Sequence, residues 1–306
     1  MKACFVDAGE SLAPETRRLR RDTDPEVTIN EQPEITPEAL PAVLAGHEIA
    51  LIDHTALPTA IARQCPQLRH VVFLGTGARS YMDPEALEAE CGIQVHLIRG
   101  YGDTAVAEMA FALMWSAAKN LALMDAGMRR GDWLRTEGME LTGKTVGLLG
   151  FGGIAAEMAR LCHGVGMRVL AWNRTPREAA GVTFVPMDTL LEQSDVLSLH
   201  LLLVDATRGL LSREKLAQMR PGAILVNTAR GALVDEDALV EALRDGRLRH
   251  AALDVYAAEP LPPGHPLSAL PNTTLAAHSA FRTPEATAKL IGAALQHCRR
   301  LETEAS

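Results

Sequence analysis

Short apolar runs rich in β-branched residues alternate with segments of helical periodicity from one end of the chain to the other. This alternation is typical of parallel sheets whose strands are joined by crossover helices. A first series of runs occupies the first third of the chain, and a second series begins near residue 145. The strands predicted in the first series are 2–7, 27–29, 49–54, 70–75 and 94–99.

The two series are separated by a long apolar stretch, 104–130, which has no internal proline and one glycine, Gly127. We predict a single helix there, too long for one crossover, that bridges two domains. In the second series, Asp235 is the expected N-cap and Gly246 the stop of one helix. The predicted strands are 145–150, 168–172, 182–185, 196–200, 223–228, 250–255 and 273–278, and the helices 154–165, 190–194, 213–219, 235–244 and 284–301.

Length and composition fit this picture, because 306 residues are roughly twice a common domain and 47% of them are hydrophobic. We therefore expect two compact cores of the α/β class. The formal net charge of −8 does not attract a polyanion, so we expect no nucleic-acid partner. A small anionic substrate would need local basic groups.

The five cysteines are odd in number and scattered, without the paired spacing of a zinc site, so we expect no metal. They are interpreted as reduced, mostly buried thiols of a cytoplasmic protein. The apolar run at 1–7 is too brief for a signal peptide, and no stretch approaches the ~18 apolar residues that cross a bilayer. We expect neither secretion nor membrane insertion. The cysteines are Cys4, Cys65, Cys91, Cys162 and Cys298.

A dinucleotide-binding signal lies where strand 145–150 runs into a helical pattern. Gly150 would permit the tight turn, and Gly152 would let the backbone approach a pyrophosphate at the positive end of the helix. Ala155 stands in the place of the third glycine. The alternative is an ordinary glycine-rich turn between a strand and a helix, but a second strand ending about 20 residues later favours the cofactor.

The end of that second strand indicates which dinucleotide is preferred. An acidic side chain there would accept hydrogen bonds from the adenosine ribose, whereas this chain has Asn173, Arg174 and Thr175. Loss of the carboxylate removes repulsion of a 2′-phosphate, and a guanidinium can bind that phosphate. The sequence favours NADP over NAD, although Arg174 could instead be a solvated loop residue.

Candidate catalytic residues follow three later strands, at the edge where doubly wound sheets bind ligands. Arg230 follows one strand, Asp254 and Glu259 lie at and beyond the end of the next, and His278 ends the last. Reduction of a 2-oxo acid needs a cation for the carboxylate and carbonyl, which Arg230 can supply. His278 can donate the proton, and Glu259 nearby would favour its protonated form. Each residue could, taken alone, be a solvated surface side chain.

Several longer strings follow one another along the chain in a specific combination. They are Asn227-Thr-Ala-Arg-Gly-Ala-Leu-Val-Asp235, Ala252-Leu-Asp-Val-Tyr-Ala-Ala-Glu-Pro260, Ala277-His-Ser279, Gly131-Asp-Trp133 and Glu140-Leu-Thr-Gly-Lys-Thr-Val-Gly147. Together they closely resemble the D-isomer-specific 2-hydroxyacid dehydrogenases, and the likeness covers nearly the whole chain. That resemblance makes Arg230 the substrate arginine, Glu259 the partner carboxylate and His278 the acid/base. It places Asp254 and the backbone of residues 228–230 near the nicotinamide.

The resemblance also implies an architecture of two doubly wound parallel-sheet domains. A Rossmann dinucleotide-binding domain, 100–282, would be inserted in a flavodoxin-like substrate domain, 1–99 plus 283–306, and closure would exclude water. Homodimers are usual in the family. The turn Gly75, Thr76 and Gly77 matches the family's glycine turn that helps to hold the substrate carboxylate. Departures from the family pattern, which put the substrate's identity in doubt, are Leu202 and Arg99 in place of prolines, and Ala78-Arg-Ser-Tyr81 after the glycine turn.

The leading functional hypothesis is an NADPH-preferring reductase of glyoxylate, hydroxypyruvate or a similar short 2-oxo acid, giving the D-2-hydroxy acid. A dinucleotide-sensing binding protein of the same fold is the alternative, since fold does not fix function. An oxidase of formate or phosphite ranks third. The residues assigned to the cofactor are Gly150, Gly152, Gly153, Ile154, Asn173, Arg174, Thr175, Leu202, Thr207, Thr228, Ala229, Arg230, Asp254 and His278.

Overall fold

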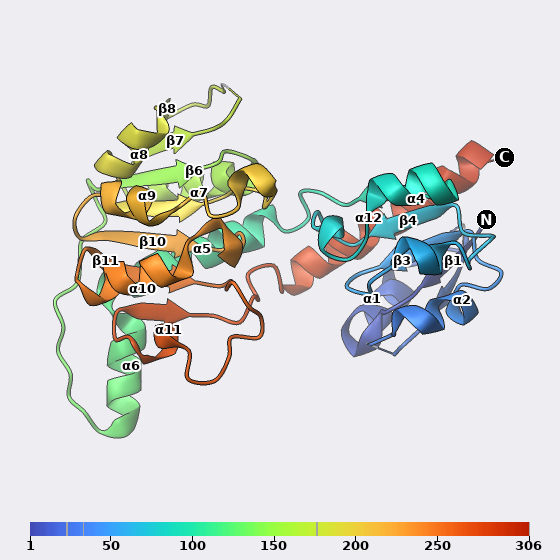
Figure 1. Cartoon of the computed structure of the whole chain (residues 1–306), viewed down its shortest axis with the longest axis horizontal. Helices are drawn as coiled ribbons and strands as arrows, with labels where there is room; N and C mark the ends of the chain where they lie inside the picture. The colour runs from blue at the N-terminus through green and yellow to red at the C-terminus, as the bar shows by residue number, and fades with distance from the viewer. Residues whose placement is uncertain (23, 33, 176, 306) are drawn as a thin grey trace. The chain divides into compact units, whose positions relative to one another are not determined.

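The computed structural model describes residues 1–22, 24–32, 34–175 and 177–305. The chain divides into two compact units (Figure 1). Unit 1 contains residues 1–102 and 282–306, and unit 2 contains residues 103–281. Each unit has its own parallel sheet, which confirms the predicted fold class of two α/β domains with parallel sheets.

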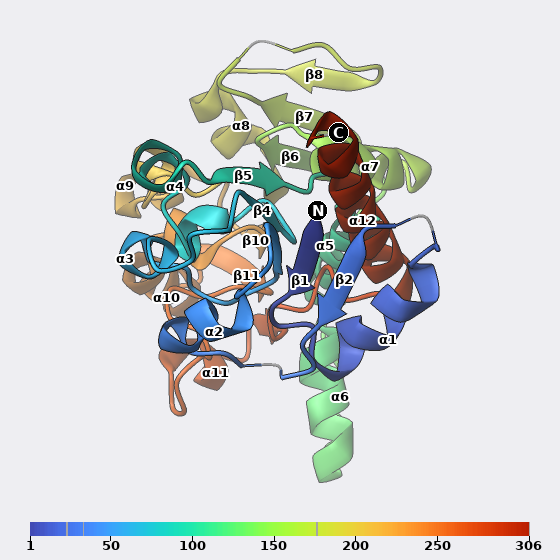
Figure 2. The same cartoon turned by 90° about the vertical axis from the view of Figure 1, so that its right-hand side faces the viewer.

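Unit 1 is built on a parallel sheet that, over the described residues, has five strands in the order β2-β1-β3-β4-β5. Helices α1 and α12 cover one face and α2, α3 and α4 the other (Figure 2). The strands are β1 Lys2–Phe5, β2 Glu26–Ile29, β3 Ile49–Ile52, β4 His70–Phe73 and β5 Gln94–Leu97. The helices are α1 Gly9–Leu19, α2 Leu40–Val43, α3 Thr59–Ala62, α4 Pro84–Cys91 and α12 Pro284–Ala305.

The last helix of the chain, α12, packs in unit 1 with residues from the start of the chain. Its residues Leu290, Ile291 and Leu295 are buried in the same apolar cluster as Phe5 and Leu51 of the sheet. Full burial of one such side chain contributes about 1.5–3 kcal/mol. Unit 2 is therefore an insertion between two segments that fold together.

Unit 2 is built on a parallel sheet that, within the described part of the chain, has seven strands in the order β12-β11-β10-β9-β6-β7-β8. Helices α5 and α7 pack on one face, and α8, α9 and α10 on the other. The strands are β6 Thr145–Leu149, β7 Arg168–Trp172, β8 Val182–Phe184, β9 Val196–Leu199, β10 Ala223–Asn227, β11 Leu248–Leu253 and β12 Thr273–Leu275. The helices are α5 Asp103–Lys119, α6 Leu121–Arg130, α7 Gly153–Gly164, α8 Met187–Gln193, α9 Arg213–Gln218, α10 Glu236–Arg244 and α11 Pro266–Ala269.

The strand order of unit 2 reverses between β6 and β9. From β6 the chain proceeds outward through β7 and β8, then returns to β9 and proceeds the other way to β12. Such a switch point, at the carboxyl ends of the strands, is where doubly wound sheets bind ligands. Each loop predicted to bind cofactor follows one of these strands.

The prediction of one helix over 104–130 is wrong. Two helices, α5 and α6, meet at Asn120, whose backbone is left-handed with φ of 53°. Asparagine tolerates this conformation better than most residues. The Asn120 Nδ2 also donates to the Glu137 carbonyl at 3.1 Å, so a contact distant in sequence supports the break. Helix α6 projects away from the sheet as a separate arm (Figures 1 and 2).

The prediction of free and mostly buried thiols is confirmed, because all five cysteines are free and four of them are buried. Burial raises the pKa of the Cys162 and Cys298 thiols to about 12, so both stay protonated near neutral pH. Among the described residues, no helix combines the length and apolar character needed to cross a bilayer.

Candidate active site

The turn after β6 contains two glycines, Gly150 and Gly153, that a larger residue could not replace without displacing a neighbour. Gly150 has φ of +94°, and a Cβ there would lie 2.6 Å from the His200 carbonyl oxygen. Gly153 lies against the carboxylate of Asp103, while a Cβ on Gly152 would meet nothing within 4 Å. Ala155, in place of a third glycine, is fully buried. The turn therefore has open space beside Gly152, where a phosphate could approach the backbone.

Helix α7 begins directly after this turn, with Gly152 as an N-cap that offers no side-chain acceptor. The amides of its first turn, at Gly153 and Ile154, lie at the positive end of a twelve-residue helix. A dinucleotide pyrophosphate fits that donor set.

Asn173 joins the glycine turn to the loop after β7. Its Oδ1 accepts from the Phe151 amide at 3.2 Å, and its Nδ2 donates to the Thr175 carbonyl at 2.8 Å. Arg174 and Thr175 are exposed beside it. Residues 173–175 therefore offer an amide and a guanidinium where a carboxylate would oppose a 2′-phosphate.

The loop after β9 offers an apolar surface on the other side of the switch point. Leu202 and Val204 are 69% and 42% exposed, although large apolar side chains are usually buried. The Thr207 hydroxyl donates to the Leu202 carbonyl at 2.7 Å and accepts from the Val204 amide at 2.9 Å, which holds the loop in shape.

The loop after β10 carries Thr228, Ala229 and Arg230. Within the described residues, the Thr228 Oγ1 is buried without a hydrogen-bond partner, as expected where a ligand would supply one. Asn227, to which the sequence analysis gave no role, orders the loop. Its Oδ1 accepts from the Ala229 amide at 3.0 Å, and its Nδ2 donates to the Arg230 carbonyl at 2.9 Å. A buried polar residue closing an apolar strand was the available signal.

His278 and Glu259 meet directly. The His278 Nδ1 lies 2.6 Å from the Glu259 Oε2, and both side chains are about one-third exposed. A carboxylate accepting at Nδ1 places a ring proton there and leaves Nε2 to exchange a proton with a ligand. The Tyr256 amide donates to the other carboxylate oxygen, Oε1, at 2.9 Å, which fixes the orientation of the glutamate.

Asp254 shapes the segment that carries the imidazole. It is fully buried, and its two oxygens accept from the Ser279 and Ala280 amides at 2.9 Å. Its carbonyl accepts from the His278 amide at 2.8 Å, and His278 itself is left-handed with φ of 49°. Such a conformation costs free energy in a non-glycine residue and persists because its surroundings fix it.

Arg230 follows β10, and β10 is the neighbour of β11 in the sheet. Gly231, the next residue, packs on the peptide that joins Tyr256 to Ala257, and a Cβ there would lie 1.9 Å from the Tyr256 carbonyl carbon. The segment with Arg230 therefore lies directly against the loop that leads to Glu259. The three candidate catalytic residues thus follow three strands that are neighbours in the sheet, β10, β11 and β12.

The predicted substrate turn lies in unit 1, after β4. Gly75 has φ of +156°, its amide donates to the Phe73 carbonyl at 2.8 Å, and Thr76 next to it is exposed. Arg79 pairs with Glu85, and Arg99 is exposed after β5.

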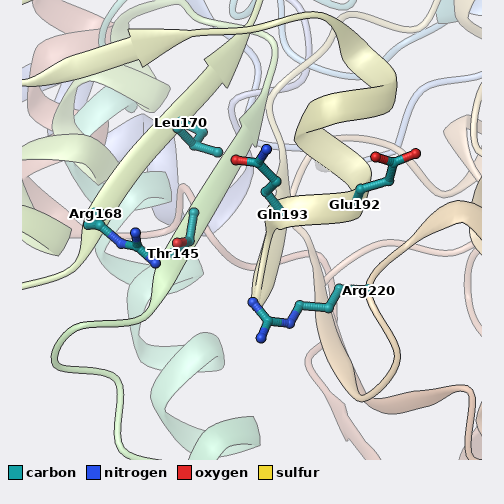
Figure 3. Close-up of a pocket in the computed structure, with 6 residues that line it drawn as sticks. All are labelled: Thr145, Arg168, Leu170, Glu192, Gln193 and Arg220. Atoms are coloured by element: carbon teal, nitrogen blue, oxygen red, sulfur yellow. The ribbon is translucent and has the colours of Figure 1, made fainter.

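A hollow of about 230 Å³ lies at the opposite end of the unit 2 sheet (Figure 3). It lies at the amino ends of β6 and β7, away from the glycine turn and from His278. Arg220 at its rim pairs with Asp195 at 3.3 Å, so this cation is already neutralised. The lining residues are Thr145, Arg168, Leu170, Glu192, Gln193 and Arg220.

Comparison with known proteins gives consistent matches. Residues 111–280 match the family model described as D-isomer specific 2-hydroxyacid dehydrogenase, NAD binding domain. A glyoxylate reductase of Aeropyrum pernix is 39% identical over 239 residues, which cover 72% of this chain and 70% of that protein. A glycerate dehydrogenase of Methylorubrum extorquens is 35% identical, with 82% and 81% of the two chains covered.

Solved structures agree with these matches. A glyoxylate reductase from Paecilomyes thermophila superposes with a TM-score of 0.85 at 28% sequence identity. The superposition covers 97% of this chain and 93% of that one. The likeness therefore extends over both units.

Proposed function

This chain belongs to the D-isomer specific 2-hydroxyacid dehydrogenase family and is an NAD(P)-dependent oxidoreductase acting on CH–OH donors, and from that premise we propose its substrate, cofactor and residues. We propose that it reduces glyoxylate, hydroxypyruvate or a similarly short 2-oxo acid to the D-2-hydroxy acid, with NADPH as the preferred reductant. The observation that carries the proposal is the hydrogen-bonded pair of His278 and Glu259, on the sheet that also carries the glycine turn.

In the proposed mechanism, a nicotinamide cofactor held at the glycine turn would supply the hydride for the carbonyl carbon of the substrate. Arg230 holds the substrate carboxylate and polarises the carbonyl, because a guanidinium stays charged and matches a carboxylate bidentately. His278 gives its Nε2 proton to the oxygen that becomes the alkoxide. Glu259 stabilises the imidazolium before transfer and keeps its ring in place.

We propose that the substrate carboxylate is also held by the backbone of Gly75, Thr76 and Gly77. Unit 1 would then be the substrate domain and unit 2 the dinucleotide domain. The exposure of Thr76 in the glycine turn after β4 supports this proposal, since backbone amides in a tight turn form an anion-binding concavity.

The preference for NADPH rests on residues 173–175. Arg174 is exposed at the end of β7, and Asn173 next to it carries no charge to repel a 2′-phosphate. The exposed Leu202 supports a site for the adenine in the loop after β9. The pyrophosphate would bind at Gly152, Gly153 and Ile154.

We also propose a homodimer that is formed through α6 and the segment that follows it. Leu121, Met128 and Trp133 are 51%, 53% and 78% exposed there. Exposed apolar patches of this kind usually mark interfaces. A second copy of this arm offers the matching apolar surface, as in isologous dimers. Sedimentation of the wild type and of Trp133→Glu tests this, and a wild-type monomer at micromolar concentration would refute it.

The central experiment follows consumption of NADPH and NADH against a panel of 2-oxo acids, with chiral analysis of the product. We expect turnover of short 2-oxo acids, a D product and a lower KM for NADPH than for NADH. Tight dinucleotide binding without turnover of any 2-oxo acid would favour a sensing protein instead. Equal dissociation constants for the two cofactors would contradict the assignment of Arg174.

A further inference from the structure

A second pair of glutamate and histidine lies beside the first. The His265 Nε2 is 3.1 Å from the Glu236 Oε1, and the two side chains are only 18% and 21% exposed. We infer that Glu236 and His265 are positioning residues, which hold the loop that presents Glu259 to His278. The inference rests on the proposed function, because it concerns the same acid/base pair.

The two carboxylates bind adjacent amides of one short loop. The Tyr256 amide donates to the Glu259 Oε1 at 2.9 Å, and the Ala257 amide donates to the Glu236 Oε2 at 3.1 Å. Glu236 comes from the start of α10, so its anchor is a helix rather than another loop. The loop that ends in Glu259 is thereby tied to a rigid element within three residues of the carboxylate.

His265 also holds Glu236 in place, and its two ring contacts define its tautomer. Its Nδ1 accepts from the Leu267 amide at 3.3 Å, as the N-cap of α11. Neutral His265 must then carry its proton on Nε2, where it donates to Glu236. One imidazole therefore connects the start of α11 to the carboxylate that holds the loop.

The same peptide is confined from a third direction by Gly231. Because a Cβ at position 231 would lie 2.5 Å from the Ala257 amide nitrogen, the loop packs against the backbone next to Arg230. Glu236 and Gly231 together fix the peptide between residues 256 and 257. A displacement of this peptide would move the Glu259 carboxylate relative to the His278 ring.

Glu236 is not required to cap its own helix. Asp235 is the N-cap of α10, with its Oδ1 accepting from the Ala238 amide at 3.0 Å. Glu236 instead turns both oxygens toward partners outside α10. This arrangement favours a role in holding the loop over a role in helix capping.

The test compares Glu236→Ala, Glu236→Gln and His265→Asn with the wild type, and uses Glu241→Ala as the matched control. Glu241 lies on the same helix but is exposed and pairs with Arg213. His265→Asn keeps an N-cap acceptor for α11 and removes the donor to Glu236. Measured are kcat, KM for NADPH, the pH profile of kcat, the thermal midpoint and the downfield proton resonance of the His278–Glu259 hydrogen bond.

For Glu236→Ala we expect kcat to fall about 10-fold with KM for NADPH little changed, since small displacements of reacting groups are costly. The alkaline limb of the kcat profile should move to lower pH, and the downfield resonance should shift or broaden. Glu236→Gln keeps an acceptor for only one of the two donors, so its kcat should lie between those of Glu236→Ala and the wild type, as should the kcat of His265→Asn. Glu241→Ala should match the wild type.

A Glu236→Ala protein that loses only thermal stability, with the wild-type pH profile and resonance, would overturn the inference. The resonance is readable without substrate, so it judges the positioning role even if the wild type reduces no 2-oxo acid. That last result would refute the proposed function separately.

Discussion

In unit 2, each of two histidines faces a carboxylate, whereas in unit 1 three histidines face one another. His278 pairs with Glu259 and His265 with Glu236. In unit 1, the His96 Nε2 lies 3.3 Å from the His70 Nδ1, and the rings of His96 and His297 have centroids 5.8 Å apart.

The surroundings of the unit 1 histidines disfavour a proton on each ring. Burial and the neighbouring imidazoles lower the pKa of His96 to about 4, and burial lowers the pKa of His70 and of His297. The other charged groups near His70 are Glu48, Glu304, Arg69 and Arg300. The rings of His70, His96 and His297 therefore stay neutral near pH 7, whereas the ring of His278 lies against a carboxylate. The two groups of histidines therefore differ in the side chains that face each imidazole.

The comparison is tested most severely by His278→Ala. We expect turnover in the reductase assay to fall roughly 100-fold or more, with NADPH affinity nearly intact, as for loss of a general acid. Fluorescence titration of NADPH gives the affinity. His96→Gln, which removes an imidazole from the unit 1 cluster, should leave turnover unchanged. Near-normal turnover of His278→Ala would contradict the catalytic role of His278.

Glu259→Gln should have the next largest effect. It keeps a carbonyl acceptor but no longer stabilises an imidazolium, so kcat should fall roughly 10- to 100-fold, as for other residues that orient a functional histidine. The thermal midpoint should stay near the wild-type value. A kcat within two-fold of the wild type would mean that His278 acts without its carboxylate.

His96→Gln should change acid stability rather than catalysis. A folded-state pKa below the unfolded one means that the unfolded chain binds more protons as pH falls from about 6.5 to about 4, so the wild type loses stability there. The variant should lose about 1 kcal/mol less between pH 7.5 and pH 5, after allowance for partial exposure. Urea unfolding at both pH values measures this, and parallel losses would contradict it.

His297→Gln should show the smallest effect, in the same direction. Its ring contacts His96 from α12, and burial together with Arg300 lowers its pKa. We expect a gain at pH 5 of roughly half that of His96→Gln. A larger gain would mean that α12, rather than the β4–β5 pair, is the centre of the cluster.

The sequence predicted every strand of both sheets to within a few residues, because each is a short apolar run with clear ends. It also placed the Asp235 N-cap, since this signal is local. The break at Asn120 was missed because the contact that supports it comes from residue 137. Glu236 and His265 were missed for the same reason: their pairing joins the start of α10 to the N-cap of α11, 29 positions apart, and neither residue has an unusual neighbourhood along the chain.

The backbone packing at Gly231 bears on how the substrate range of this enzyme could change. Because its Cα lies against the Tyr256–Ala257 peptide, the segment with Arg230 and the loop to Glu259 cannot slide past each other. The backbone segments that carry Arg230 and Glu259 are therefore packed together in the fold itself, independently of any ligand. We expect variation in substrate range to arise in loops that can be exchanged without moving these packed segments.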